Sequence, residues 1–282
     1  MTERLADLSV RIDGIHQLGS VVNAMKGIAA ARASAARGQV EVVDRFAETI
    51  AAAMSSVIDP EAAISAEHPD SEAGKIGLIV FCAEQGFAGA FSERVLDSLG
   101  KYSDTETVFL IGARGQSLMA LRELTPVWFA AMPSHTSGIP KLANAIADEI
   151  YHRIDAGRVD RLDAVYTIWK SGRPEIVRRT LYPIDRSGFA TKQTDQPLIQ
   201  LPLEALVVSL SIDYLYALIC KAALHAFAAE NEARLEAMTA AGSQIAREIA
   251  VLQATLRRVR QEAITAEIIE LSIGASAARD RR

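Results

Sequence analysis

The sequence is poor in aromatic residues and in cysteine. Phe, Trp and Tyr make up only 6% of the 282 residues, whereas hydrophobic residues make up 50%, so alanine and aliphatic side chains supply most of the core. This composition favours helices that pack at short range over an aromatic-rich β core. Cys82 and Cys220 are far apart and lie in apolar runs, so we expect two buried thiols in a reducing compartment, with no disulfide and no zinc site.

An excess of basic residues is also missing. Thirty Lys and Arg stand against 35 Asp and Glu, a formal net charge of −5, so the chain lacks the footprint of a nucleic-acid-binding protein. The N-terminus, MTERLADLSV, is charged from the start, unlike a signal peptide. The most hydrophobic segment, 205–229, contains Asp213, Lys221 and His225. These charges favour a buried amphipathic helix over a membrane span, and we expect a cytoplasmic chain without membrane insertion.

Proline is absent from both ends of the chain. The segment 2–58 has none, and 202–278 has none after its first residue. Apolar residues recur in both at spacings of three and four, which predicts two long helices, each with the seam of a coiled coil. Each helix alone would leave its apolar stripe in water, so we expect the two to pair in antiparallel orientation. The seam residues are Leu5, Leu8, Ile12, Ile15 and Val22 in the first helix, and Ile245, Ile249, Leu252, Leu256 and Val259 in the second.

The middle of the chain has a different pattern. Strand-like runs (IGLIVFC, ETVFLIG, RLDAVYTIWK) alternate with helix-like runs (FSERVLDSL, RGQSLMALREL, PKLANAIADEIYHRI). This alternation predicts a parallel sheet with crossover helices, and the turn Ser171–Pro174 predicts an antiparallel hairpin at one edge. The expected fold class is α/β, with a coiled coil of the terminal helices and a central Rossmann-like domain. The predicted domains are 1–58, 74–200 and 202–278, with 59–74 as the joint between the first two.

Two glycine turns in this middle domain resemble nucleotide-binding loops. EQGFAGAF, 84–91, follows the first strand but lacks a third glycine and a lysine, so it fits neither G-x-G-x-x-G nor the Walker A pattern. IGARG, 111–115, places Arg114 where a helix N-terminus would attract an anion. Turns of this kind also serve simply to reverse the chain. The five histidines show no metal-ligand spacing, and we expect no catalytic residue, metal or cofactor.

The C-terminal block carries the most specific pattern. AENEARLEAMTAA, 229–241, followed by RQEAITAEIIELSIGASAA, 260–278, resembles the C-terminal helix of the gamma subunit of F-type ATP synthases. The resemblance extends over nearly the whole chain. The matching positions are Glu230, Arg234, Ala237, Met238, Arg260, Gln261, Ile264, Thr265, Glu267, Glu270, Gly274 and Ala275, then Ala24, Met25, Ala29 and Ala30, and Tyr166, Pro174 and the Leu-Tyr-Pro of 181–183.

Some positions depart from the family pattern. The family's Ile-Thr-Lys-Ala-Met is VVNAM here, the turn EQGFAGAF stands where the family has Asp-Arg-Gly-Leu-Cys-Gly-Gly, and the chain is acidic. These departures favour a divergent branch, such as the second-copy ATPases that some bacteria carry.

The resemblance implies a mechanical function. The chain would be the central-stalk rotor, itself non-catalytic, that couples ion flow through the membrane c-subunit ring to ATP synthesis or hydrolysis in the beta subunits. Its partners would be the alpha, beta and epsilon subunits and the c-ring, at the cytoplasmic face of the bacterial plasma membrane, and the glycine turns would be scaffold. The residues matching positions that contact beta subunits are Met25, Arg234, Arg260, Gln261, Thr265 and Glu267. A stand-alone nucleotide-binding enzyme with coiled-coil arms and a coiled-coil adaptor are the alternatives.

Overall fold

The computed structural model describes residues 2–57, 74–100, 106–184 and 199–279. The predicted joint at 59–74 therefore lies, except for Gly74, outside the described residues. The chain divides into two compact units. Unit 1 consists of 1–28 and 235–282, and unit 2 of 29–234. Two long helices pass through both units: α1, Thr2–Val57, and α6, Leu203–Arg279. The division into 1–58, 74–200 and 202–278 stays a prediction.

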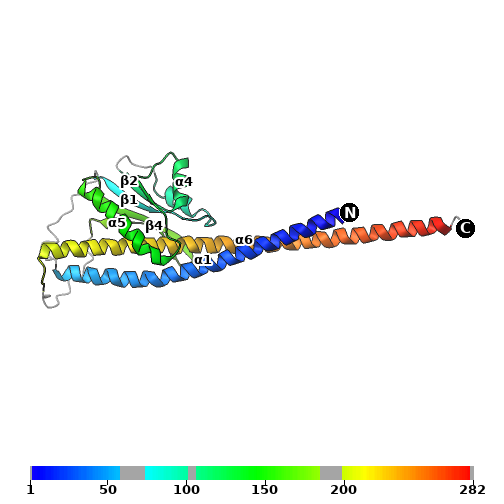
Figure 1. Cartoon of the computed structure of the whole chain (residues 1–282), viewed down its shortest axis with the longest axis horizontal. Helices are drawn as coiled ribbons and strands as arrows, with labels where there is room; N and C mark the ends of the chain where they lie inside the picture. Colours follow the sequence, from blue (N-terminus) through cyan, green and yellow to red (C-terminus); the bar gives the residue numbers. More distant parts are fainter. Residues whose placement is uncertain (1, 58–73, 101–105, 185–198, 280–282) are drawn as a thin grey trace. The chain divides into compact units, whose positions relative to one another are not determined.

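Unit 2 contains a five-stranded sheet with the order β3-β2-β1-β4-β5 (Figure 1). The pairs β1·β2, β1·β4 and β2·β3 are parallel, whereas β4 and β5 form an antiparallel hairpin at the edge. The predicted parallel sheet with an edge hairpin is confirmed. The short β3 has three residues and was not predicted, since so short a run carries no periodicity. The strands are β1 Ile76–Phe81, β2 Glu106–Ile111, β3 Trp128–Ala130, β4 Arg161–Lys170 and β5 Arg173–Tyr182.

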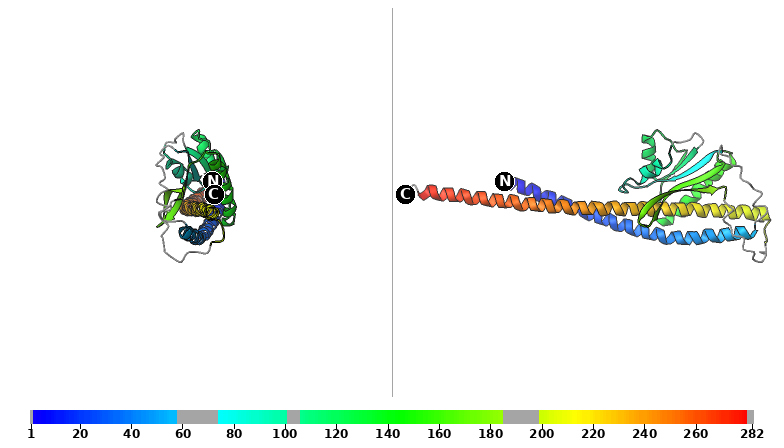
Figure 2. Two further views of the ribbon diagram at one scale, coloured as in Figure 1. Left: turned by 90° about the vertical axis from the view of Figure 1, so that its left-hand side faces the viewer. Right: turned by 180° about the vertical axis from the view of Figure 1, so that it is seen from behind.

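Helices cover both faces of this sheet. Alternate β1 side chains point to opposite faces, as the pleat requires: Ile79 and Phe81 pack with α5 and α6, and Leu78 and Val80 with α3 and α4. Figures 1 and 2 show α5 and α4 on opposite sides of the strands. The sheet is buried on both faces, which explains why its central strands read as continuous apolar runs. The helices are α3 Phe91–Asp97, α4 Ala113–Leu121 and α5 Ile139–Asp155, preceded by the 3-10 turn η1, Thr136–Gly138.

Within unit 2, α1 and α6 lie side by side and run antiparallel. Lys221 of α6 pairs with Asp44 of α1 at 2.6 Å. Eleven residues further along α6, Glu232 pairs with Arg37, seven residues earlier in α1. Small and aliphatic side chains fill the contact, among them Met54, which is fully buried, and Ala217.

Helix α6 is also the one helix among the described residues that is long and apolar enough to cross a membrane by length and composition. A core helix of a soluble protein meets the same criteria. Here most residues from Leu215 to Arg234 are buried against the sheet and α1. Two of the three polar groups noted in the sequence have partners: Lys221 pairs with Asp44, and His225 stacks on Tyr166 with ring centroids 5.9 Å apart. The third, Asp213, is exposed. The part of the segment 205–229 from Leu215 onward is therefore a core helix, whereas residues 205–214 are exposed or half-buried.

Candidate functional site

In unit 1, the seam of α1 follows a strict seven-residue repeat. The residues that are buried or half-buried are Leu5, Leu8, Ile12, Ile15, Gly19 and Val22, which keep the repeat, and Met25, which follows Val22 by three residues. Their spacing of three and four keeps the seam on one face of the helix. Gly19 was not among the predicted seam residues, because a glycine carries no hydrophobic signal.

The seam of α6 follows the same repeat. Its seam positions, all buried or half-buried, are Leu235, Met238, Gly242, Ile245, Ile249, Leu252, Leu256 and Val259. The register between the helices is given by Gly19, which lies against Ile245, and by Gly242, which lies against Val22. Arg11 and Glu248 add an exposed ion pair at 3.7 Å. The helices are therefore antiparallel here too, and in this register α1 begins level with about residue 262 of α6.

Four predicted contact residues lie close together on α6. Arg260, Gln261, Thr265 and Glu267 fall within two helical turns and are all exposed. The Thr265 hydroxyl donates to the Gln261 carbonyl at 2.9 Å. Counting 100° per residue, Gln261 lies on the side of α6 opposite the seam residues Leu252 and Val259. This surface is therefore available for contact with another protein.

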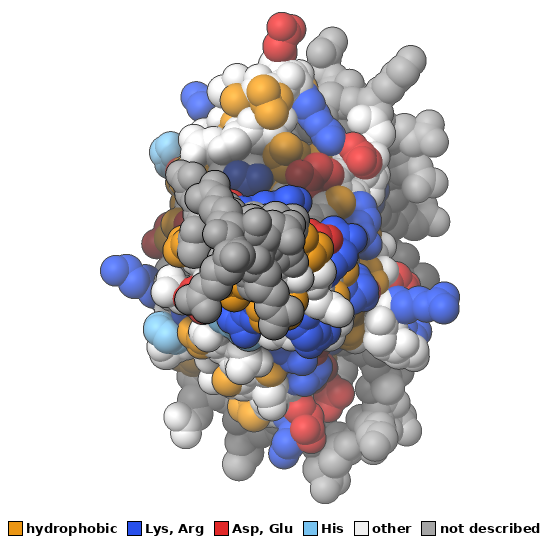
Figure 3. Space-filling model, turned by 90° about the vertical axis from the view of Figure 1, so that its right-hand side faces the viewer, with side chains coloured by type: hydrophobic (Ala, Val, Ile, Leu, Met, Phe, Trp, Pro, Cys, Tyr) orange, Lys and Arg blue, Asp and Glu red, His pale blue; other side chains and the backbone are white. Residues whose placement is uncertain are grey.

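Exposed apolar and basic side chains surround these four residues. Ile264, Ile268, Ile269 and Leu271 are each more than half exposed, and Arg257 and Arg258 precede the group and are exposed as well. Figure 3 views the molecule from the end at which the C-terminus lies and shows Lys and Arg side chains with hydrophobic side chains among them.

Met25 lies apart from this group. It is half-buried on α1, and the register Gly19–Ile245 puts it level with about residue 239 of α6. Arg260 is therefore about 30 Å further along the helix. Met25 therefore lies beside the seam and is partly covered, whereas the Arg260 group is exposed and separate from it.

Arg234 differs from the other predicted contact residues because it is buried, with 5% of its surface exposed. It belongs to unit 2, where its guanidinium donates to the carbonyl oxygens of Gln85 and Gly86 at 3.2 Å each. It also donates to Asn231 at 3.1 Å and pairs with Glu230 at 2.5 Å. The structure thus gives Arg234 partners inside the chain, and a direct contact with another subunit stays a prediction for this residue.

Glu230 binds the same turn as an acceptor, whereas Arg234 binds it as a donor. It is 4% exposed, and its carboxylate accepts hydrogen bonds from the backbone N–H groups of Glu84 and Gln85 at 3.2 and 3.4 Å. The first glycine turn is therefore fastened to α6 through both donors and acceptors of its backbone. We call Glu230, Arg234 and the turn 84–87 the turn joint.

Glu84 extends the turn joint to two further elements. One oxygen of its carboxylate accepts from Ala113 N, the first residue of α4, at 3.1 Å, and from Met132 N, just after β3, at 2.9 Å. In nucleotide-binding turns a phosphate takes such donors at a helix N-terminus. Here the protein's own carboxylates, Glu84 and Glu230, occupy them and bring negative charge, so the turn is not suited to bind a phosphate.

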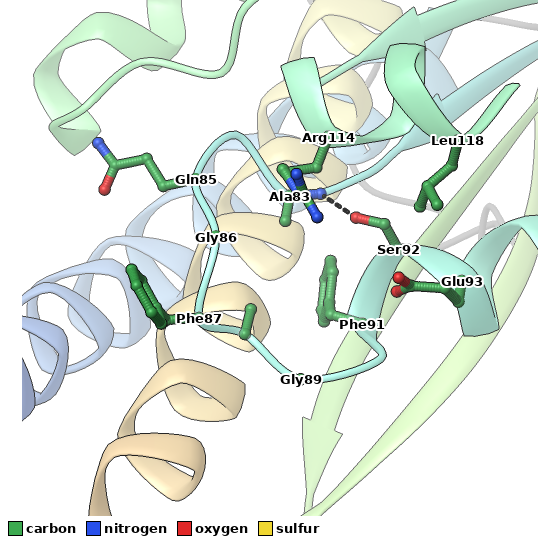
Figure 4. Close-up of a pocket in the computed structure, with 11 residues that line it drawn as sticks. Ala83, Gln85, Gly86, Phe87, Gly89, Phe91, Ser92, Glu93, Arg114 and Leu118 are labelled. Atoms are coloured by element: carbon green, nitrogen blue, oxygen red, sulfur yellow. Dashed lines mark hydrogen bonds between the residues drawn. The ribbon is translucent and has the colours of Figure 1, made fainter. Parts of the chain in front are cut away.

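The pocket beside this turn is small (Figure 4). Its cavity volume is about 30 Å³, far below the 300–1,000 Å³ of typical ligand sites. Ser92 accepts a hydrogen bond from Ala83 N at 3.0 Å within it. The lining residues are Ala83, Gln85, Gly86, Phe87, Ala88, Gly89, Phe91, Ser92, Glu93, Arg114 and Leu118.

The glycines of the second turn are required by close packing. Gly112 has φ +100°, and a Cβ there would come within 2.3 Å of the Cys82 carbonyl oxygen. A Cβ at Gly115 would come within 2.8 Å of the Cys82 sulfur. Both glycines therefore let α4 approach β1, and they need no ligand to explain them.

No metal or redox site emerges from the described part of the chain. No group of three or more His, Cys, Asp or Glu there is arranged to hold a metal ion. Cys82 and Cys220 are both free and buried, as predicted. Burial raises the pKa of the Cys82 thiol to about 12, so this thiol is unreactive at neutral pH.

The paired helices and the sheet have the architecture of an ATP synthase central stalk. The family model described as ATP synthase matches residues 4–278, and the chain therefore belongs to the ATP synthase family. Within this family its relatives are gamma chains. The ATP synthase gamma chain of Halothermothrix orenii is 28% identical over 290 residues, with 98% of this chain and 99% of the relative covered.

Solved structures share the fold. The rotor of the Euglena gracilis mitochondrial ATP synthase in rotational state 1 matches with a TM-score of 0.64 at 14% identity, over 94% of this chain and 100% of that one. A structure of the OSCP, F1 and c-ring assembly of the same enzyme in rotational state 3 matches with the same TM-score and identity, over 99% of this chain and 95% of that one. The predicted fold class is confirmed.

Proposed function

We propose that this chain is the rotating gamma subunit of an F-type ATP synthase and is itself non-catalytic. The observation that carries the proposal is the family match over residues 4–278, which includes both helices that form the seam. The chain would turn inside the hexamer of alpha and beta subunits and couple ion flow through the membrane ring to ATP synthesis or hydrolysis.

The seam suits a shaft that transmits rotation. In unit 1, seam residues are buried or half-buried from Leu5 to Val22 on α1 and from Leu235 to Val259 on α6, and Ile245 and Val22 lie against glycines of the facing helix. Interlocking side chains in a close-packed seam resist bending and sliding more than a single helix does. Near Arg260 the outer surface combines aliphatic and basic side chains, a mixture that can contact different subunits in turn.

The exposure of four predicted contact residues on α6 supports a contact with other subunits. We propose that Arg260, Gln261, Thr265 and Glu267 form one surface that meets the beta subunits, with Met25 forming a second. The fork of donors on the Arg260 guanidinium suits carboxylate oxygens that are met and released as the shaft turns. For Arg234 we propose an indirect role through the turn that it holds.

The partners and location follow from the same proposal. The chain would bind the alpha and beta subunits at the shaft, and the epsilon subunit and the c-ring through the sheet-bearing part. It would lie peripherally at the cytoplasmic face of the bacterial plasma membrane. A stand-alone nucleotide-binding enzyme is not favoured, because Glu84 and Glu230 occupy the donors that a phosphate would need.

The test is reconstitution with the alpha and beta subunits of the same organism. A complex purified through a tag on beta should contain this chain, hydrolyse ATP, and rotate a bead attached to the chain when ATP is added. The purified chain alone should neither bind nor hydrolyse ATP. A chain that hydrolyses ATP by itself, or a complex in which the bead stays still during hydrolysis, would contradict the proposal.

A further inference from the structure

The contact between α6 and the sheet in unit 2 combines small and large side chains, and the large ones include Ile219, Leu224 and Phe227. Ala222, Ala223 and Ala226 are at most 1% exposed and belong to the same core as the sheet and α5. Alanine gives a helix low ridges and shallow grooves. Apolar attraction is also non-directional. The alanine part of this surface adds little resistance to rotation of the helix about its own axis, so that resistance must come from the larger side chains, from the stack of His225 on Tyr166 and from polar contacts.

The turn joint adds directional hydrogen bonds to this packing. Four hydrogen bonds connect α6 with the turn 84–87, all made by Glu230 and Arg234. Hydrogen bonds weaken steeply when their angle changes, and bonds to charged groups are roughly twice as strong as neutral ones. Both side chains are buried, with 6% of the Arg234 side chain and 5% of the Glu230 side chain exposed, so water does not readily replace their partners.

Further hydrogen bonds connect the turn with other parts of unit 2. Through its carboxylate, Glu84 ties the turn to the first residue of α4 and to Met132 after β3. A twist applied to α6 at Glu230 and Arg234 therefore reaches three separate elements of the sheet-bearing part. All of these contacts lie within unit 2.

We propose that the turn joint is the torque-bearing connection between α6 and the sheet-bearing part of the rotor, with Glu230 and Arg234 as its positioning residues. This inference rests on the proposed rotor function and adds where the torque passes. It also accounts for a buried charge pair that no catalytic chemistry requires. Isolated buried charges are costly, and they persist where geometry is held by several bonds at once.

The experiment measures the torsional stiffness of the assembled rotor. Leu121, at the end of α4, is 83% exposed, whereas Cys82 and Cys220 are buried. A Leu121→Cys variant therefore offers one accessible thiol on the sheet-bearing part for attaching a bead. The chain is assembled with cysteine-free alpha and beta subunits fixed to glass. The angular fluctuation of the bead is then recorded while the rotor pauses at limiting ATP.

We expect Arg234→Gln, in the Leu121→Cys background, to increase the variance of the bead angle about twofold or more, because the two carbonyl bonds and the ion pair are lost. The control is Arg37→Gln. It makes the same change of charge and removes the pair with Glu232 on the same stretch of α6, but Arg37 is 56% exposed and pairs with α1 rather than with the sheet. Its variance should equal that of the parent.

A milder variant keeps the proposal testable if Arg234→Gln does not fold or assemble. Arg234→Lys keeps the charge beside Glu230, so the chain should assemble, but a single nitrogen cannot replace a planar fork that reaches both carbonyls. An intermediate variance is expected. A purely structural role would lower the melting temperature and leave the variance unchanged.

The outcomes separate the two proposals. If the parent bead does not rotate with ATP, the rotor function itself fails. If the parent rotates but Arg234→Gln and Arg234→Lys fluctuate like the parent, the turn joint does not bear torque. An increase of the same size in Arg37→Gln would also overturn the inference, since it would show general loosening of α6.

Discussion

Gly19 of α1 lies directly against Ile245 of α6 in unit 1. A Cβ built on Gly19 would be 3.3 Å from Ile245 Cγ2, a tighter approach than most side chains make. Three residues later on α1, the relationship is reversed, because a Cβ built on Gly242 of α6 would be 4.0 Å from Val22 Cγ1 of α1. Each glycine thus accepts an aliphatic side chain of the other helix, and the two pairs fix the register of the seam.

This relationship predicts different effects of two similar substitutions. Gly14→Ala has open space around the new Cβ and should stabilise the chain by about 0.5–1 kcal/mol, since alanine favours the helix. Gly19→Ala should gain less or nothing, because Ile245 must move. Urea unfolding of both variants checks this. An equal gain at the two positions would show that the seam does not resist a side chain at Gly19.

A larger residue at the same position gives a sharper result. Gly19→Leu overfills the seam and should cost about 1–3 kcal/mol. Adding Ile245→Ala should restore part of this loss, because the cavity receives the leucine. Failure of the second substitution to restore any stability would contradict the pairing of these two residues.

One glycine from each of the two glycine turns gives another matched pair of substitutions. Gly112→Ala would place a Cβ 2.3 Å from a backbone oxygen at φ +100°, and we expect a loss of about 3 kcal/mol or more. Gly86→Ala, in the first turn, meets no atom within 4 Å and should stay within about 0.5 kcal/mol of the parent. Thermal unfolding followed by circular dichroism distinguishes them. A Gly112→Ala chain as stable as the parent would mean that α4 does not approach β1 this closely.

Asp163 makes the stability depend on pH. Its side chain is fully buried on β4 and accepts hydrogen bonds from Arg161 and Arg178 at 2.7–3.2 Å. Burial alone would raise the pKa of this carboxyl, but the bonds from Arg161, Arg178 and Thr180 hold it below its ordinary value of 3.8. Because the folded pKa is the lower one, the stabilisation is present in full above pH 3.8 and is lost as the pH falls through the folded pKa.

We therefore expect Asp163→Asn to cost about 2 kcal/mol at pH 7 and clearly less at pH 3. Urea unfolding of the variant and the parent at both pH values gives the comparison. Asp97→Asn is the control, because Asp97 is 67% exposed in its pair with Arg122, and such surface pairs contribute little. An equal cost of Asp163→Asn at the two pH values would show that the carboxylate charge is not the source of the stability.

The exposed group on α6 predicts a functional effect without a structural one. In the assembled complex, Arg260→Ala combined with Gln261→Ala should slow ATP turnover or uncouple it from ion transport, because a contact with the beta subunits is removed. Since both residues are exposed, the melting temperature of the chain should be unchanged. Arg122→Ala, on the sheet-bearing part, is the control with normal turnover. Unchanged turnover in the double variant would favour a passive adaptor.

The long helices and the sheet were predictable because their signals are local. A seven-residue repeat such as that from Leu5 to Val22 requires one helix face to be buried, whatever covers it. Apolar runs bounded by turns predicted β1, β2 and β4 in the same way. Gly19 and β3 were missed, the first because it has no side chain and the second because it is too short to carry a pattern.

The sequence by itself determined the periodicity, and with it two long helices, a seam on each and a parallel sheet between them. Only the tertiary structure decided what Arg234 does. Glu230 and Arg234 are 145–149 positions away from the turn that they hold, and no local pattern reports a bond over that separation. The resemblance implied that Arg234 contacts the beta subunits, which stays a prediction. The folding of β1 against α6 buries the charges of Glu230 and Arg234 and pairs them with the turn's backbone. Periodicity is a local property that can be read from neighbouring residues, whereas the partner of a buried charge depends on which distant segments the fold brings together.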